Sequence, residues 1–233
     1  MIIGVDQLKE SVYKDSYFTE KAGCLTVNNV EESTENTLMS VEMQSKGRFI
    51  NLSNKILKEG CNIYKAEDRQ SGRISYRRDC DGICLLEVDG RNILLVVEVK
   101  SGFNEIKKKG FEQLVASYVK VRGILQSIDG YNPADYEEMG LLVSYPPDGS
   151  YTMPARSIIG SKLKMIAPTA LDTLNNSNSA TLMTNHEVVL NLSGYNVDAC
   201  HVNSSLINPT LRVKHAVVAD KSNTGVIDLD SFL

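Results

Sequence analysis

The stretch that decides the fold is Asp79–Ser101, which reads DCDGICLLEVDGRNILLVVEVKS. It contains two apolar runs separated by Asp89-Gly90. That dipeptide is a strong signal for a two-residue β-hairpin loop, because both positions of a type I′ turn require a positive φ. The second run is apolar at nearly every position, which is typical of a strand buried on both faces, and it ends in Glu98 and Lys100. The sequence therefore predicts a buried hairpin with charge gathered at its open end.

The length of the loop determines which charged residues face each other across the hairpin. With a two-residue loop, Asp81 lies opposite Glu98 and Asp79 lies opposite Lys100, and opposed residues project to the same side of the sheet. A four-residue loop would place Asp81 opposite Lys100 instead. Glu98 and Lys100 share a face in either register, because they are two residues apart on one strand. Both registers therefore bring carboxylates and one lysine together.

Carboxylates that converge in a partly dry site repel each other unless one is protonated or a cation lies nearby. Mg²⁺ removes this cost, because it is commonly held by one or two carboxylates together with water and substrate phosphate. The pattern of Asp81, followed by Glu98-Val99-Lys100 at the end of the next apolar strand, resembles the PD-(D/E)xK nuclease superfamily. The resemblance implies that Asp81, Glu98 and the carbonyl of Val99 bind Mg²⁺ or Mn²⁺ and that Lys100 assists the attacking water. Asp79 is a rival to Asp81 as the metal-binding aspartate.

The resemblance also implies a fold, an α/β restriction-endonuclease-like core in which a mixed central sheet carries the site on a β-hairpin and is flanked by helices. The core of the superfamily runs helix, strand, hairpin, helix, strand. Apolar spacing predicts the second helix over Asn104–Gln126 and a buried strand over Gly140–Tyr145, parallel to the end of the hairpin. Upstream, the first helix is predicted over Thr37–Glu59, and the first strand over Asn62–Tyr64 or Arg73–Arg77.

Two further side chains are candidates for the catalytic group. Members of the superfamily often carry a glutamate on the first helix that reaches the metal, and Glu42 is the best match, with Gln44 and Glu59 as alternatives. A solvated helical glutamate is the competing interpretation. On the second helix, Gln113 is a candidate for contact with the substrate or with Lys100.

A group of lysines on the second helix is the candidate nucleic-acid contact. Lys107, Lys108 and Lys109 come at the start of this helix, and Lys120 lies on the same face as Gln113. Lysines in such a position can neutralise phosphates beside the metal site. A solvated helix face is the alternative interpretation of the same charges.

Composition limits the classes of function. The chain has 233 residues and a formal net charge of −4, which does not match a protein that coats nucleic acid through charge alone. Its length suits one compact domain, with an N-terminal extension over 1–37, the nuclease-like core over 38–150 and a C-terminal appendage over 151–233. Residues 175–179, NNSNS, are predicted to form an exposed loop in that appendage, followed by short strands near 187–192, 211–219 and 226–229.

The function expected from the resemblance is metal-dependent hydrolysis of phosphodiester bonds, in DNA rather than RNA because most of the superfamily cuts DNA. The alternative is a non-catalytic module of the same fold that binds nucleic acid or a protein partner. Many members are homodimers, so the resemblance also allows a homodimer. We expect an intracellular protein with no membrane contact, because no apolar run is long enough for a membrane span and no signal peptide is recognisable.

Overall fold

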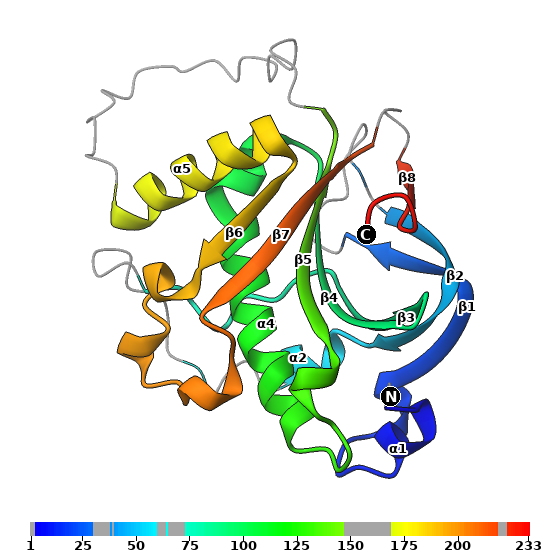
Figure 1. The fold of residues 1–233 in the computed structure, drawn as a ribbon. Helices are drawn as coiled ribbons and strands as arrows, with labels where there is room; N and C mark the ends of the chain where they lie inside the picture. Colours follow the sequence, from blue (N-terminus) through cyan, green and yellow to red (C-terminus); the bar gives the residue numbers. More distant parts are fainter. Residues whose placement is uncertain are drawn as a thin grey trace.

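The chain forms an α/β structure built on one open, mixed sheet (Figure 1). The structure is a computed structural model, and it describes residues 3–29, 38, 40–59, 64, 73–146, 169–218 and 223–233. In the described part of the chain, the sheet has eight strands in the order β1-β2-β3-β4-β5-β7-β6, and β8 pairs with β2. The strands are β1 (Phe18–Asn28), β2 (Ser40–Leu52), β3 (Gly82–Val88), β4 (Arg91–Lys100), β5 (Glu137–Ser144), β6 (Glu187–Asn191), β7 (Thr210–Val217) and β8 (Thr224–Asp228).

Helices and helical turns connect these strands. The α-helices are α1 (Val5–Lys9), α2 (Lys55–Glu59), α3 (Phe103–Glu105), α4 (Phe111–Gln126) and α5 (Ala170–Asn185). The shorter turns are η1 (Asp15–Tyr17), the π-helical turn η3 (Ile106–Gly110), η4 (Pro133–Asp135), η5 (Leu192–Tyr195), η6 (Asp198–Cys200) and η7 (Ser204–Leu206). None of the helices in the described ranges is long and apolar enough to cross a membrane.

The predicted hairpin is confirmed as β3 and β4 with a two-residue loop. Val88 pairs with Arg91, and Asp89 and Gly90 have φ values of 51° and 73°. These two positive φ values are what a type I′ turn requires, and the twist of that turn matches the twist of the strands. The last eight residues of β4 are all buried, as expected for a strand covered on both faces.

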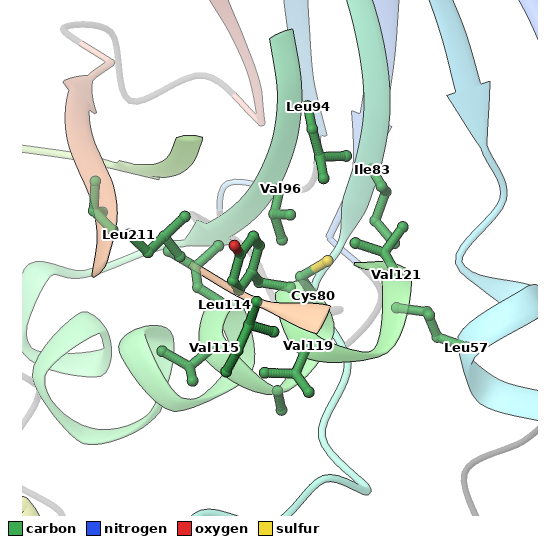
Figure 2. Packing of buried hydrophobic residues seen from close by; sticks show 14 of the residues in the cluster. Leu57, Cys80, Ile83, Leu94, Val96, Leu114, Val115, Val119, Val121 and Leu211 are labelled. Atoms are coloured by element: carbon green, nitrogen blue, oxygen red, sulfur yellow. The ribbon is translucent and has the colours of Figure 1, made fainter. Parts of the chain in front are cut away.

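The second helix and the strand after it are also confirmed. The elements α3, η3 and α4 together cover the predicted helical range. Strand β5 runs parallel to β4, with Glu98 beside Leu142 and Lys100 beside Ser144. Helix α4 lies across one face of the sheet (Figure 1). Figure 2 shows Leu114 and Val121 of this helix in one buried cluster with Ile83 of the hairpin. The strand–helix–strand unit therefore fixes α4 over the strands that carry the candidate site.

The opposite face of the sheet is covered by strands and by the C-terminus. Its cluster includes Leu95, Val97 and Val99 of β4 together with Leu25 of β1 and Ile227 of β8. Strands β1 and β2 curve away from the plane of β4 and β5, and β8 lies beside β2 (Figure 1). This curvature lets the sheet bury its own second face, which would otherwise need a further layer of helices.

The predicted helix over Thr37–Glu59 is wrong. The described residues of this range form the long strand β2, followed only by the short helix α2. Strand β2 pairs with β1, β3 and β8, so its hydrogen-bonding groups are satisfied by three non-local neighbours. Such pairings override a helical apolar pattern, because most of the stability of either element comes from tertiary packing. Arg73–Arg77 forms no strand, and Asn62 and Ile63 lie outside the described residues.

The predicted loop over residues 175–179 is also wrong, because these residues lie inside α5. Thr169 begins this helix with a capping box to Asp172. Asn175 and Ser179 are buried, and the Asn175 side chain donates to Glu112 of α4 at 3.2 Å. The polar residues that suggested a loop therefore serve as contacts between two packed helices.

Two glycines provide a matched test of this backbone geometry. A Cβ added at Gly90 or at Gly123 would meet no atom within 4 Å, so any effect on stability comes from the backbone. Gly90→Ala should lower the free energy of unfolding by about 1 kcal/mol because of the positive φ. Gly123→Ala, inside α4, should raise it by about 0.5–1 kcal/mol. Urea denaturation of both variants measures the two changes, and a change of the same sign in both would contradict the turn assignment.

Candidate functional site

The open end of the hairpin brings Asp81 against strand β4. The ladder ends with Gly82 opposite Val97, and the Asp81 N–H donates to the Val97 carbonyl at 3.1 Å. One Asp81 carboxylate oxygen accepts the Val99 N–H at 2.9 Å. Asp81 therefore contacts Val97 and Val99, the neighbours of Glu98 in β4. This is the position opposite Glu98 that the two-residue loop predicts.

Glu98 and Lys100 form a buried ion pair. The Lys100 Nζ lies 2.5 Å from a Glu98 carboxylate oxygen, and their side chains are 0% and 3% exposed. Both residues alternate with Val97 and Val99, which pack on the strand-covered face, so they project toward α4. A buried pair of this kind is strongly coupled, because each charge loses water and depends on the other.

Cys80, between Asp79 and Asp81, is affected by the charges of the site. Burial raises the pKa of the Cys80 thiol far above its usual range, and the neighbouring Glu98 and Asp81 carboxylates raise it further. The Cys80 N–H donates to Ser117 of α4 at 2.8 Å. Cys80 is therefore held as a neutral thiol beside both candidate metal-binding carboxylates.

Helix α4 anchors the segment that precedes β3. The Gln113 amide donates to the Asp79 carbonyl at 3.0 Å, and the Lys120 ammonium donates to the Arg78 carbonyl at 2.7 Å and pairs with the Asp79 carboxylate. Counting from the two-residue loop placed Asp79 opposite Lys100. In the structure, Asp79 instead pairs with Lys120. Lys120 is 5% exposed, so this lysine holds the segment in place and is not at the surface.

A cleft of about 330 Å³ opens beside Asp81. Four cations and two carboxylates line it, so its local charge is positive although the whole chain is negative. The cleft is formed by α2, the segment before β3, η3 and α4. Its lining residues are Lys58, Arg77, Arg78, Asp79, Cys80, Asp81, Lys109 and Gln113.

The structure divides the predicted lysine group. Lys109 is exposed and lines the cleft, whereas the Lys107 ammonium lies over the Phe103 ring, 5.8 Å from its centroid. The Lys108 side chain lies outside the described part of the structure. Lys109 belongs to a π-helical turn, and such turns are frequent at functional sites.

Glu42 and its alternatives lie elsewhere. Glu42 is on β2 between β1 and β8, and it accepts a hydrogen bond from Gln44 at 2.7 Å. Glu59 is exposed and binds Lys14 at 3.0 Å. None of the three residues lines the cleft, and Glu42 and Gln44 lie on a strand where a helix was expected.

Three cleft residues, Lys58, Arg77 and Arg78, were not predicted from the sequence. The adjacent basic pair just before Asp79 was the available signal, but its position next to the site depends on how α4 holds this segment. Arg78 pairs with the buried Glu112 at 3.2 Å, and Glu112 in turn accepts from Asn175. The position of Arg78 is therefore linked to the packing of α5 on α4.

Ser144 of β5 and His215 of β7 form a second buried polar pair in the same sheet. The Ser144 hydroxyl donates to the Tyr145 carbonyl at 2.8 Å, so the His215 ring, 2.9 Å away, donates to the Ser144 oxygen through Nε2. Ser144 is therefore not arranged as a nucleophile whose proton His215 could accept. Burial, followed by the charge of His186, lowers the pKa of His215 to about 4.

The Glu98–Lys100 pair makes a prediction about stability. In the presence of EDTA, Lys100→Met should lower the free energy of unfolding by about 3–5 kcal/mol, because it leaves the Glu98 charge buried without its cation. Glu98→Leu combined with Lys100→Met should recover most of this loss, since neither charge remains. A double-mutant cycle in urea measures the coupling. Single and double variants of equal stability would contradict a coupled buried pair.

His215 makes a prediction about acid stability. Above pH 6.5 the residue is neutral in the folded and unfolded chains, and between pH 6.5 and about 4 only the unfolded chain gains the proton. Stability should therefore fall with pH across this window, by about 3 kcal/mol from this residue. His215→Gln should flatten the curve of unfolding free energy against pH, relative to wild type, whereas His201→Gln, at an exposed position, should not. Identical curves for wild type and His215→Gln would contradict the prediction.

Comparisons with known proteins assign no family to this geometry. No family model, curated protein or solved structure matches the chain. Any function must therefore be inferred from the end of the hairpin and from the basic cleft beside it.

Proposed function

We propose that the protein is a metal-dependent nuclease of the PD-(D/E)xK type that hydrolyses phosphodiester bonds, with DNA as the substrate. The observation that carries this proposal is the binding of the Asp81 carboxylate to the Val99 N–H at 2.9 Å. This contact places one carboxylate next to the buried Glu98 and Lys100 and at the edge of a basic cleft. The sequence pattern of Asp81, Glu98 and Lys100 thus agrees with the position of Asp81 beside Glu98 and Lys100 in the structure.

The order of elements supports the same proposal. A strand, a hairpin, a helix and a parallel strand occur in this order as β2, β3–β4, α4 and β5, with the short helix α2 between β2 and β3. This is the order of the superfamily core from its first strand onward, with the site at the end of the hairpin. The chain departs from that order upstream of the hairpin, because the range expected to form the first helix is occupied by strand β2, and strand β1 precedes it.

The residues present suit a divalent cation with a preference for oxygen. Asp81 and Glu98 supply carboxylate oxygens, which are the ligands that Mg²⁺ takes in proteins. Mg²⁺ or Mn²⁺ would be held by these two carboxylates and the carbonyl of Val99, the remaining positions being left for water and phosphate. Among the described residues, no group of three His, Cys, Asp or Glu side chains is placed to hold a metal ion.

When bound, such a cation would supply Lewis-acid activation of water and of the phosphate oxygens. The residues of the chain would divide the other tasks. Lys100 would orient the attacking water and stabilise the negative charge that develops on the phosphate. Glu98 would hold the Lys100 ammonium in position, and Gln113 and Lys120 would hold the segment that carries Asp81. The cations of the cleft would bind the phosphate backbone.

A non-catalytic binding module is the second candidate, and one observation favours it. Glu98 and Lys100 neutralise each other at 2.5 Å, and neither lines the cleft. In such a module, the pair would serve only to close the end of a buried strand. The cleft would then bind its ligand without any chemistry at the hairpin.

Asp81 provides the sharpest test of the two candidates. Asp81→Asn keeps an oxygen that can accept the Val99 N–H but removes the negative charge. Calorimetric titration should show Mn²⁺ affinity weakened by at least about 10-fold, since even indirect partners of a metal contribute that much. Cleavage of plasmid DNA should be lost in parallel, with the thermal midpoint of unfolding close to that of wild type.

Asp79→Asn is the matched control, because Asp79 lines the same cleft but is paired with Lys120. It should retain most of the Mn²⁺ affinity. If Asp79→Asn abolishes metal binding and Asp81→Asn does not, the aspartate assignment is reversed. If wild type binds no Mn²⁺ with or without DNA, the nuclease proposal fails and the binding module takes its place.

A further inference from the structure

We infer that the basic cleft is a binding site for the phosphate group of a nucleotide, held chiefly by Lys58, Arg77 and Lys109. This inference deepens the proposed function, on which it rests for the choice of a nucleotide as the ligand. Phosphate binding itself requires neither a metal nor catalysis, so it can be tested separately.

The charges of the cleft favour an anion. Its four cations come from three separate segments, namely α2, the residues before β3, and η3. Charges of one sign that gather on segments far apart in sequence repel one another, and an anion that binds between them removes this cost. Arg78 is paired with Glu112 and Asp79 with the buried Lys120, and the rest of the lining carries Lys58, Arg77 and Lys109 together with one carboxylate, Asp81.

Two of the cleft arginines are held in position by the surrounding structure. The Arg77 guanidinium donates to the Tyr64 carbonyl at 2.9 Å, and Arg78 pairs with Glu112, which is 1% exposed. An arginine that is already oriented loses little rotamer entropy on binding, and its planar donors match phosphate oxygens. The cleft therefore contains positioned donors in addition to mobile lysines.

Gln113 and the volume of the cleft describe the rest of the site. It lines the cleft, is 3% exposed and donates its amide N–H to the Asp79 carbonyl. Its Oε1 atom has no hydrogen-bond partner among the described residues. A cleft of about 330 Å³ is at the small end of ligand pockets, which suits one nucleotide unit better than a duplex.

Lys58 and Lys55 allow a matched comparison within α2. Both are exposed lysines on the same short helix, but only Lys58 lines the cleft. Substitution by glutamine removes one positive charge from each. Arg78 is left unchanged in this test, because its loss would leave Glu112 buried without its cation.

The experiment measures fluorescence anisotropy of a labelled single-stranded oligonucleotide in EDTA, at several salt concentrations. Lys58→Gln, Arg77→Gln and Lys109→Gln should each weaken binding by about 3-fold to 10-fold and should reduce the salt slope of log K by about 1. Lys55→Gln should bind like wild type. Equal losses in Lys55→Gln and Lys58→Gln, or no loss in any cleft variant, would overturn the proposal.

Competition against the labelled oligonucleotide distinguishes a nucleotide from inorganic phosphate as the ligand of the cleft. Adenosine monophosphate should displace the oligonucleotide at a lower concentration than inorganic phosphate does, and the three cleft variants should weaken its binding. If the monophosphate binds in the cleft but the oligonucleotide does not, the phosphate site stands and the nuclease proposal fails. If inorganic phosphate competes as well as the monophosphate, the assignment to a nucleotide is overturned. Retained binding with lost cleavage in Asp81→Asn would instead support both proposals.

Discussion

Burial of β4 on both faces is the constraint on which the rest of the structure depends. A strand without a solvated face must be covered by two layers, and its neighbours must satisfy both rows of backbone hydrogen bonds. Helix α4 covers one face, and the curved strands with the C-terminus cover the other. The chain places Glu98 and Lys100 at the end of this strand, where each charge must find a partner. The candidate site exists because two charged residues follow the apolar run Ile93–Val97 at the buried end of this strand.

Helix α4 links this constraint to the cleft. Its apolar side chains pack on the hairpin (Figure 2). Its buried polar side chains hold the segment before β3. Ser117, Gln113 and Lys120 each contact the backbone of residues 78–80. The segment thus lies along the helix with Arg77, Arg78 and Asp81 at the cleft. One helix therefore determines the position of both the candidate metal carboxylate and the candidate phosphate-binding cations.

The polar contacts between α4 and α5 extend this arrangement to the C-terminal part of the chain. Glu112 binds Arg78 on one side and Asn175 on the other, and Asn175 also accepts from Tyr195 at 3.1 Å. Glu112, Asn175 and Tyr195 are buried, so loss of one of them would leave its partners without that hydrogen bond at a cost of about 1–3 kcal/mol. The C-terminal part, which contributes β6, β7 and β8 to the same sheet, thus also supports the cleft.

The sequence by itself determined the elements whose signals are local. Asp89-Gly90 predicted the turn, because both of its positions favour positive φ, although two loop lengths remained open and the structure decided the register. Apolar spacing predicted the helix that contains α4 and the strand β5. Only the tertiary structure decided that residues 40–52 form a strand, since that choice depends on pairing with β1, β3 and β8. It also decided that Asn175 is a buried helix contact, that Lys120 is an anchor, and that Arg77 and Arg78 line the cleft. The physical reason is that pairing, burial and charge proximity join residues far apart in the chain, whereas turn and periodicity signals act within a few residues.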